Sequence, residues 1–152
     1  PYLYKAADNP AGGVDDATIL SFEDGVRGDR LAFLEQFSQQ FFSAHGQLKV
    51  SEAQRRYAVQ IASFASPKGT LDCIAAFSRT DFRSDLQKVQ VPALILHGDA
   101  DAIVPFEVSG ARTAASLRSS RVHLVRGGPH GFNVSHAQEF NQALLDFLER
   151  GN

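Results

Sequence analysis

Two short segments, each directly after an apolar run, hold the residue types best suited to chemistry. The run Leu94–Leu96 leads into His97-Gly98-Asp99-Ala100-Asp101, and a second run ending at Val125 leads into Gly128-Pro129-His130-Gly131. A carboxylate beside an imidazole selects one ring tautomer and stabilises the charged ring, which leaves the other ring nitrogen to take a proton from a nucleophile. Asp101 and His130 are therefore candidates for two members of a Ser-His-Asp triad.

A parallel strand pair would bring these two segments together. Residues 91–96 form a continuous apolar run, which predicts a strand buried on both faces, and residues 121–125 predict a second strand. Residues 106–117 between them predict a helix, and such a β-α-β unit has parallel strands. Ligands bind beyond the carboxyl ends of these strands, where both segments lie. Two parallel strands rarely form a sheet alone, so we expect neighbouring strands from another chain or from a segment outside this sequence.

Helices are predicted on both sides of this unit, so the fold class is α/β. Ser51 with Gln54, and Ser135 with Gln138, have the spacing of capping boxes, and Gly28-Asp29 marks a break between two helices. The predicted helices cover residues 16–26, 30–42, 52–63 and 67–77, and a last helix follows Ser135 and ends near Gly151.

The helices are rich in phenylalanine. Leu31, Leu34, Phe37 and Phe41 repeat at helical spacing and predict one apolar stripe. Most rings are expected in the core, and some are expected to line an apolar pocket for aromatic or short acyl groups. We expect Phe132, two residues after His130, to lie near the site. The other rings in this group are Phe22, Phe33, Phe42 and Phe64.

Composition excludes several classes of partner. The chain has 152 residues, 43% hydrophobic content and a formal net charge of −2, with no run of Lys or Arg, so nucleic acid is not an expected partner. No apolar stretch reaches the roughly 20 residues that cross a bilayer. The single cysteine, Cys73, cannot form an internal disulfide, and we expect a buried thiol on an apolar helix face in a cytoplasmic protein.

At this point the residues resemble a known family. Residues 66–150 look like the C-terminal part of an α/β-hydrolase, and residues 1–65 resemble the helical cap that precedes it. The likeness is to the cofactor-free haloperoxidase and aryl esterase branch, and it rests on three motifs: Thr80-Asp81-Phe82, His97 to Phe106, and Pro129-His130-Gly131-Phe132-Asn133. We therefore divide the chain into a cap segment, 1–65, and a core segment, 66–152.

The resemblance also implies an activity and a set of residue roles. It implies hydrolysis of small carboxylic esters, with perhydrolysis as a variant, and it implies no metal or organic cofactor. Asp101 matches the triad acid, His130 matches the triad base, and Asp99 matches an acidic position that shapes the loop.

The nucleophile of this family is missing from the chain. The family places its serine in a Gly-x-Ser-x-Gly turn ahead of the acid and the base, and no such pentapeptide occurs here. Ser109 is expected inside a helix and Ser135 at a helix cap, so neither suits the role. We expect the serine, and the first strands of the sheet, on an N-terminal half upstream of Pro1.

Two other interpretations remain open. Asp99, Asp101, His97 and His130 could ligate a metal, although the chain has no His-x-x-x-His or Cys-x-x-Cys pattern. The chain could also be a non-catalytic interaction module that pairs with a partner, or with itself as a homo-oligomer, through a strand edge or the cap helices. The remaining histidines are expected at the surface or at helix caps: His45, His123 and His136.

Overall fold

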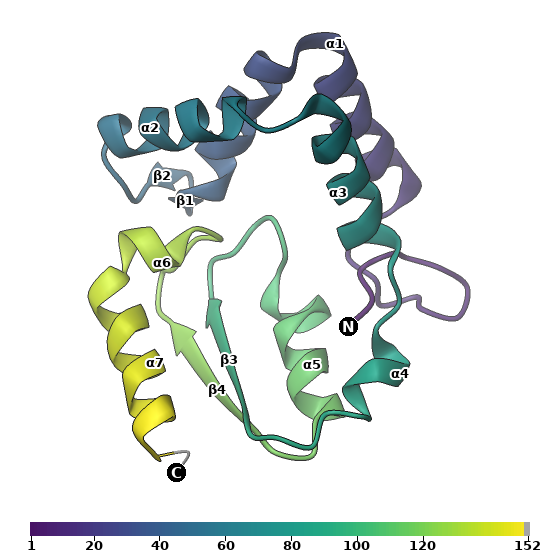
Figure 1. Cartoon of the computed structure of the whole chain (residues 1–152), viewed down its shortest axis with the longest axis vertical. Coiled ribbons are helices and arrows are strands. Elements are labelled where there is room, and N and C mark those ends of the chain that lie inside the picture. The colour runs from purple at the N-terminus through teal and green to yellow at the C-terminus, as the bar shows by residue number, and fades with distance from the viewer. Residues whose placement is uncertain (151–152) are drawn as a thin grey trace.

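A computed structural model describes residues 1–150, the side chain of Arg150 excepted. Its lower layer holds two strands, β3 (Ala93–Gly98) and β4 (Ser120–Val125), which pair in parallel. Figure 1 shows this pair between α5 (Gly110–Ser116) and α7 (Ala137–Arg150), with the remaining long helices above. The predicted β-α-β unit is confirmed, and the carboxyl ends of both strands point toward the upper helices.

The strands are less buried than the sequence predicts. Residues 93–97 of β3 are half-buried, and Val122 and Leu124 of β4 are exposed. Within the described residues β3 pairs with β4 alone, so its other edge carries no strand. The expected additional strands stay a prediction.

Two details of the C-terminal part of the chain differ from the prediction. The single helix expected over 106–117 is a short 3-10 turn, η1 (Phe106–Val108), followed by α5. The interruption falls at Ser109, whose hydroxyl donates to the carbonyl of Pro105 at 2.7 Å and so competes with helical hydrogen bonds. The second difference is at Ser135, which ends α6 (Phe132–Ser135) and contacts His136 Nδ1 at 2.9 Å instead of forming the predicted capping box. The predicted end near Gly151 lies outside the described residues.

The upper layer begins with α1 (Asp16–Phe41), which is two helical segments joined at Asp29. Asp29 has φ −145° and ψ 92°, and its carboxylate accepts the N–H of Ala32 at 3.0 Å, which caps the second segment. The predicted break is therefore confirmed. Asp15 caps the first segment through the N–H of Thr18.

A hairpin that the sequence analysis missed follows α1. Strands β1 (Ser43–Ala44) and β2 (Gln47–Leu48) pair antiparallel across His45 and Gly46, which have φ 52° and 76°. Positive φ at both central residues is typical of a tight hairpin turn, and glycine adopts it without steric cost.

Three more helices complete the chain: α2 (Glu52–Ser63), α3 (Pro67–Arg79) and the short α4 (Arg83–Leu86). Ser51 and Gln54 form the predicted capping box, and Ser66 caps α3 ahead of Pro67. Among the described residues, no helix combines the length and apolar character needed to cross a membrane. The expected cytoplasmic location stays a prediction.

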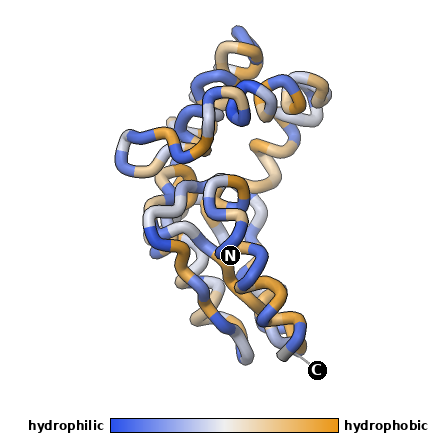
Figure 2. The backbone as a smooth tube through the Cα atoms, turned by 90° about the vertical axis from the view of Figure 1, so that its left-hand side faces the viewer, coloured by the Kyte–Doolittle hydropathy of each residue, from blue (hydrophilic) through white to orange (hydrophobic). Residues whose placement is uncertain are grey.

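The main hydrophobic core lies between α1, α3 and the N-terminal loop. Its buried residues are Val14, Ile19, Val26 and Ile74, with Phe22 and Phe33 packed against them. The predicted apolar stripe is wrong at Leu31, which is exposed, and the ring of Phe64 is 82% exposed. Figure 2 shows hydrophobic and hydrophilic residues alternating along the C-terminal helix α7, which packs on both strands.

Candidate active site

The loops that follow β3 and β4 are locked together. The Asp99 carboxylate accepts the N–H of Gly127 at 2.6 Å, and the N–H of Ala100 donates to the carbonyl of Gly128 at 3.1 Å. A Cβ atom at Gly98 would collide with the same Gly128 carbonyl, so only glycine permits this approach. Asp99 therefore shapes the loops.

This junction brings Asp101 and His130 together. His130 Nδ1 lies 2.7 Å from Asp101 Oδ2. The other carboxylate oxygen accepts the N–H groups of Ile103 and Val104, both at 2.9 Å. The Asp101 side chain is 3% exposed and that of His130 is 32% exposed, so the acid is buried while the imidazole reaches the surface.

The electrostatic surroundings determine where the imidazole proton lies. Burial by itself raises the pKa of Asp101, but the imidazoles of His130 and His97 and the N–H of Val104 together hold this pKa well below its usual range. Asp101 is therefore ionised at neutral pH. Because a carboxylate can only accept, His130 donates from Nδ1, and its Nε2 keeps a lone pair in the neutral ring. Among the described residues, no group is hydrogen-bonded to that Nε2.

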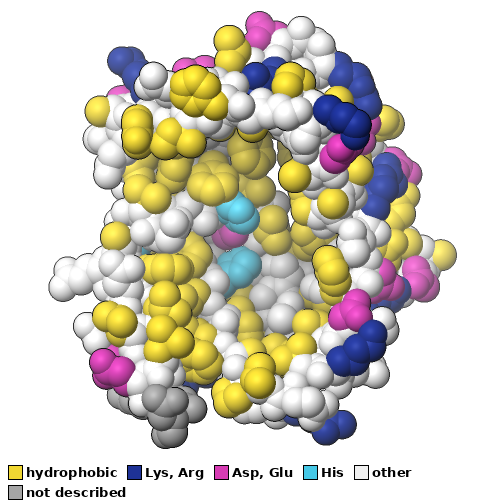
Figure 3. All heavy atoms as spheres, viewed as in Figure 1, with side chains coloured by type: hydrophobic (Ala, Val, Ile, Leu, Met, Phe, Trp, Pro, Cys, Tyr) yellow, Lys and Arg dark blue, Asp and Glu magenta, His cyan; other side chains and the backbone are white. Residues whose placement is uncertain are grey.

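The pair lies at a hollow above the strands, and its imidazole reaches the surface there. Figure 3 shows two histidine side chains with an acidic side chain between them in the hollowed front face. The distances give the same arrangement, because Asp101 Oδ2 lies 2.7 Å from His130 Nδ1 and 3.4 Å from His97 Nε2. Such a site can take up and return a proton at His130 Nε2.

Comparison with known proteins adds to this geometry. The chain is 39% identical over 151 residues to a Synechocystis sp. protein described as a non-heme chloroperoxidase, which covers 98% of this chain and 54% of the relative. It is 31% identical over 153 residues to a non-heme chloroperoxidase of Kitasatospora aureofaciens, covering 99% of this chain and 55% of the relative. No protein-family model matches the chain.

A solved structure is more similar still. The crystal structure of a bromoperoxidase from Bacillus anthracis is 58% identical with a TM-score of 0.95, over 98% of this chain and 54% of that one. The chain belongs to the α/β-hydrolase superfamily. It spans about half the length of these relatives, which agrees with the predicted C-terminal part of an α/β-hydrolase fold.

The end of α1 contacts the histidine loop directly. The N–H of Gly131 donates to the carbonyl of Phe41 at 2.8 Å, and a Cβ atom at Gly131 would lie 2.5 Å from the ring of Phe42. The Phe41 ring packs edge-on against His130, with ring centroids 4.8 Å apart. The end of α1 is thus part of the site, whereas the sequence placed Phe41 in an apolar stripe, among rings expected in the core or in an apolar pocket.

Phe132, the ring predicted beside the site, has a different environment. It is 9% exposed and packs against Phe140 of α7, with ring centroids 5.6 Å apart. The structure thus gives Phe132 a packing contact, and its contact with substrate stays a prediction.

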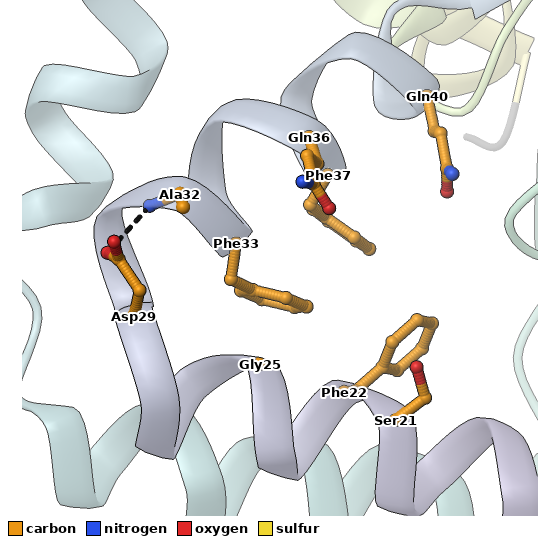
Figure 4. Close-up of a pocket in the computed structure, with 9 residues that line it drawn as sticks. All are labelled: Ser21, Phe22, Gly25, Asp29, Ala32, Phe33, Gln36, Phe37 and Gln40. Atoms are coloured by element: carbon orange, nitrogen blue, oxygen red, sulfur yellow. Dashed lines mark hydrogen bonds between the residues drawn. The ribbon is translucent and has the colours of Figure 1, made fainter.

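Three pockets lie among the upper helices α1, α2 and α3. One of about 520 Å³ lies between α1, α2 and α3, and one of about 240 Å³ lies between α1 and α2 beside Phe41. A third, of about 410 Å³, lies in the bend of α1, where Phe22, Phe33 and Phe37 face one another (Figure 4). None of the three includes Asp101 or His130 in its lining.

Cys73 faces the largest of these three pockets and is exposed, so the prediction of a buried thiol is wrong. The face of α3 that carries it borders an open pocket instead of a packed core. The proposed division at residue 65 stays a prediction, although α3 packs closely on α1.

The remaining candidates lie elsewhere. Ser109 is buried and bonded to Pro105, and Ser135 contacts His136, so neither hydroxyl reaches His130. His123 pairs with Glu139 of α7 at 2.9 Å. Within the described part of the chain, no three His, Cys, Asp or Glu side chains are arranged to hold a metal ion.

Proposed function

We propose that this chain supplies the acid and the base of a serine-type carboxylic ester hydrolase, and that the nucleophilic serine comes from polypeptide outside these 152 residues. The observation that carries the proposal is the 2.7 Å contact between Asp101 Oδ2 and His130 Nδ1, with His130 Nε2 available beyond it. The two-fold greater length of the relatives leaves room for the missing half of the fold.

The geometry supports a two-step reaction. The serine oxygen attacks the acyl carbonyl carbon while its proton moves to His130 Nε2, and the ionised Asp101 stabilises the resulting imidazolium. The imidazolium then protonates the leaving alcohol, and an acyl-enzyme remains. Water attacks this ester as His130 again takes the proton, and the acid leaves as the serine regains it. With hydrogen peroxide in place of water, the same step releases a peracid.

The cap suggests the class of acyl group. The two pockets between the cap helices are lined almost wholly by apolar side chains, and they share Leu34, Phe37 and Ala62. Phe37 packs against Phe41, which in turn packs against His130, so apolar lining extends from the pockets to the imidazole. We therefore propose esters with an aromatic or short aliphatic acyl group as substrates.

Complementation tests the proposal. The chain is co-expressed with the N-terminal half of the Bacillus anthracis bromoperoxidase, and hydrolysis of an aromatic acetate ester is measured for each half and for the mixture. We expect activity only in the mixture, and we expect His130→Ala to abolish it. His123→Ala is the matched control, because this histidine lies on β4 and pairs with Glu139 away from the site.

Two outcomes would contradict the proposal. One is activity of the isolated chain that survives His130→Ala, which would place the chemistry elsewhere. The other is a stable complex of the two halves without esterase activity, which would favour the interaction module.

A further inference from the structure

His97 is a second imidazole at the same carboxylate. It is the residue before the last one of β3, its side chain is 13% exposed, and its ring packs edge-on against Phe106 with centroids 5.4 Å apart. Its Nε2 lies 2.9 Å from the carbonyl oxygen of Val104 and 3.4 Å from Asp101 Oδ2. This histidine has no part in the reaction steps above.

The contact with Val104 settles the protonation of this ring nitrogen. A carbonyl oxygen can only accept, so His97 Nε2 must carry a hydrogen in both the neutral and the charged ring. This hydrogen is donated to the Val104 carbonyl. Its partial positive charge also faces Asp101 Oδ2, the oxygen that accepts from His130 Nδ1.

Val104 links His97 to the acid through two hydrogen bonds. Its N–H donates to Asp101 Oδ1 at 2.9 Å, while its carbonyl accepts from His97. His97, near the end of β3, therefore fixes the position of Val104, and the Val104 N–H in turn fixes Asp101 Oδ1, the oxygen that does not contact His130. Removing the His97 donor would leave the Val104 carbonyl with only the longer 3.4 Å contact from the Ser109 hydroxyl, and it would remove the N–H group that faces Asp101 Oδ2.

We propose that His97 is a positioning residue for the acid-base pair: it holds the Asp101 carboxylate in the orientation that keeps the His130 proton on Nδ1. His97 acts through Asp101 and does not touch the substrate. The inference rests on the proposed function for its effect on rate, but its effect on the imidazole tautomers is independent of that function.

The charges around His97 agree with this role. The Asp101 carboxylate is the main cause of a raised pKa at His97, burial opposes it, and the Val104 carbonyl and the more distant Glu107 add to it. The Asp101 carboxylate thus interacts electrostatically with His97 while it also contacts His130.

The first experiment measures imidazole tautomers in the chain itself. Long-range proton–nitrogen NMR correlations at mildly alkaline pH distinguish Nδ1–H from Nε2–H for each neutral ring. We expect Nε2–H at His97 and Nδ1–H at His130. In His97→Phe, which keeps a ring but loses the donor, we expect His130 to populate Nε2–H. In His97→Gln, whose amide can still donate to Val104, we expect His130 to keep Nδ1–H.

Controls make the result decisive. His123→Gln should leave the His130 signals unchanged. A folded His97→Phe with an unaltered His130 tautomer would overturn the proposal. If His97→Phe does not fold, the native chain decides, because a neutral His97 protonated only at Nδ1 overturns it equally.

The second experiment uses the complemented enzyme. We expect His97→Phe to lower kcat roughly 10- to 100-fold with KM nearly unchanged, as for a misplaced catalytic group, and His97→Gln to restore most of the rate. A rise in KM at constant kcat would overturn the positioning role. If no variant, the native chain included, gains activity on complementation, the proposed function fails while the tautomer spectra still decide the role of His97.

Discussion

The loops that hold Asp101 and His130 differ from the upper helices α1, α2 and α3 in the interactions that stabilise them. In the loops, the carboxylate and the glycine backbone have specific hydrogen-bond partners, and a single added Cβ atom at Gly98 would collide with backbone. Among the upper helices, pockets stay open and rings such as Phe64 and Phe77 lie at the surface. Directional polar contacts hold Asp101 and His130 in one geometry, whereas the contacts among the apolar rings of the upper helices are not directional.

The largest effect is expected from Asp101→Asn, which removes the carboxylate from the loop contact with His130. The amide keeps the size of the carboxylate but can place an N–H toward His130, which favours the wrong imidazole tautomer. We expect kcat of the complemented enzyme to fall about 10⁴-fold with KM little changed. Steady-state kinetics on an aromatic acetate ester measure this, and a loss below tenfold would contradict the role of Asp101.

Two apolar substitutions test which residues of the upper helices are buried. Ile19 is 0% exposed, so Ile19→Ala should lower the free energy of unfolding by about 2–5 kcal/mol. Phe64 is 82% exposed, and Phe64→Ser should change it by no more than about 0.5 kcal/mol. Urea unfolding followed by circular dichroism gives both values. Equal losses would mean that the Phe64 side chain is buried in solution.

The junction of the two regions is tested at Gly131. Its missing Cβ makes room for Phe42, so Gly131→Ala should cost about 1–3 kcal/mol of unfolding free energy through overpacking. Gly28→Ala is the matched control, because a Cβ there meets nothing within 4 Å. This control should stabilise the chain by about 0.4–1 kcal/mol or leave it unchanged. Similar results for both variants would show that Phe42 does not pack closely against the histidine loop.

The smallest effect is a pH dependence carried by Asp101. Its folded pKa lies below the usual 3.8, so its ionised form stabilises the fold above that pH, and this stability is lost as the pH falls through the folded pKa. We expect the stability of the native chain to drop more steeply than that of Asp101→Asn between neutral pH and pH values under 3.8. Urea unfolding at several pH values measures the difference, and parallel curves would contradict it.

Local signals predicted those parts of the fold that depend on neighbouring residues. Three helix starts depend on a side chain that binds a backbone N–H three residues later. These side chains are Ser51, Ser66 ahead of Pro67, and Asp29 at the break in α1. The same kind of signal failed at Ser135, where a short helix ends before the expected box. The hairpin at His45-Gly46 was missed, although the glycine is a usable sign of a tight turn.

The sequence alone determined the two loop motifs, their placement after parallel strands, the loop-shaping role of Asp99 and the membership suggested by those motifs. Only the tertiary structure showed that Phe41 packs on His130, that His97 shares the Asp101 carboxylate, and that Cys73 borders an open pocket. The reason is physical. A cap or a strand depends on residues close in the chain, whereas a contact between α1 and the histidine loop, or the exposure of one helix face, depends on how distant elements pack.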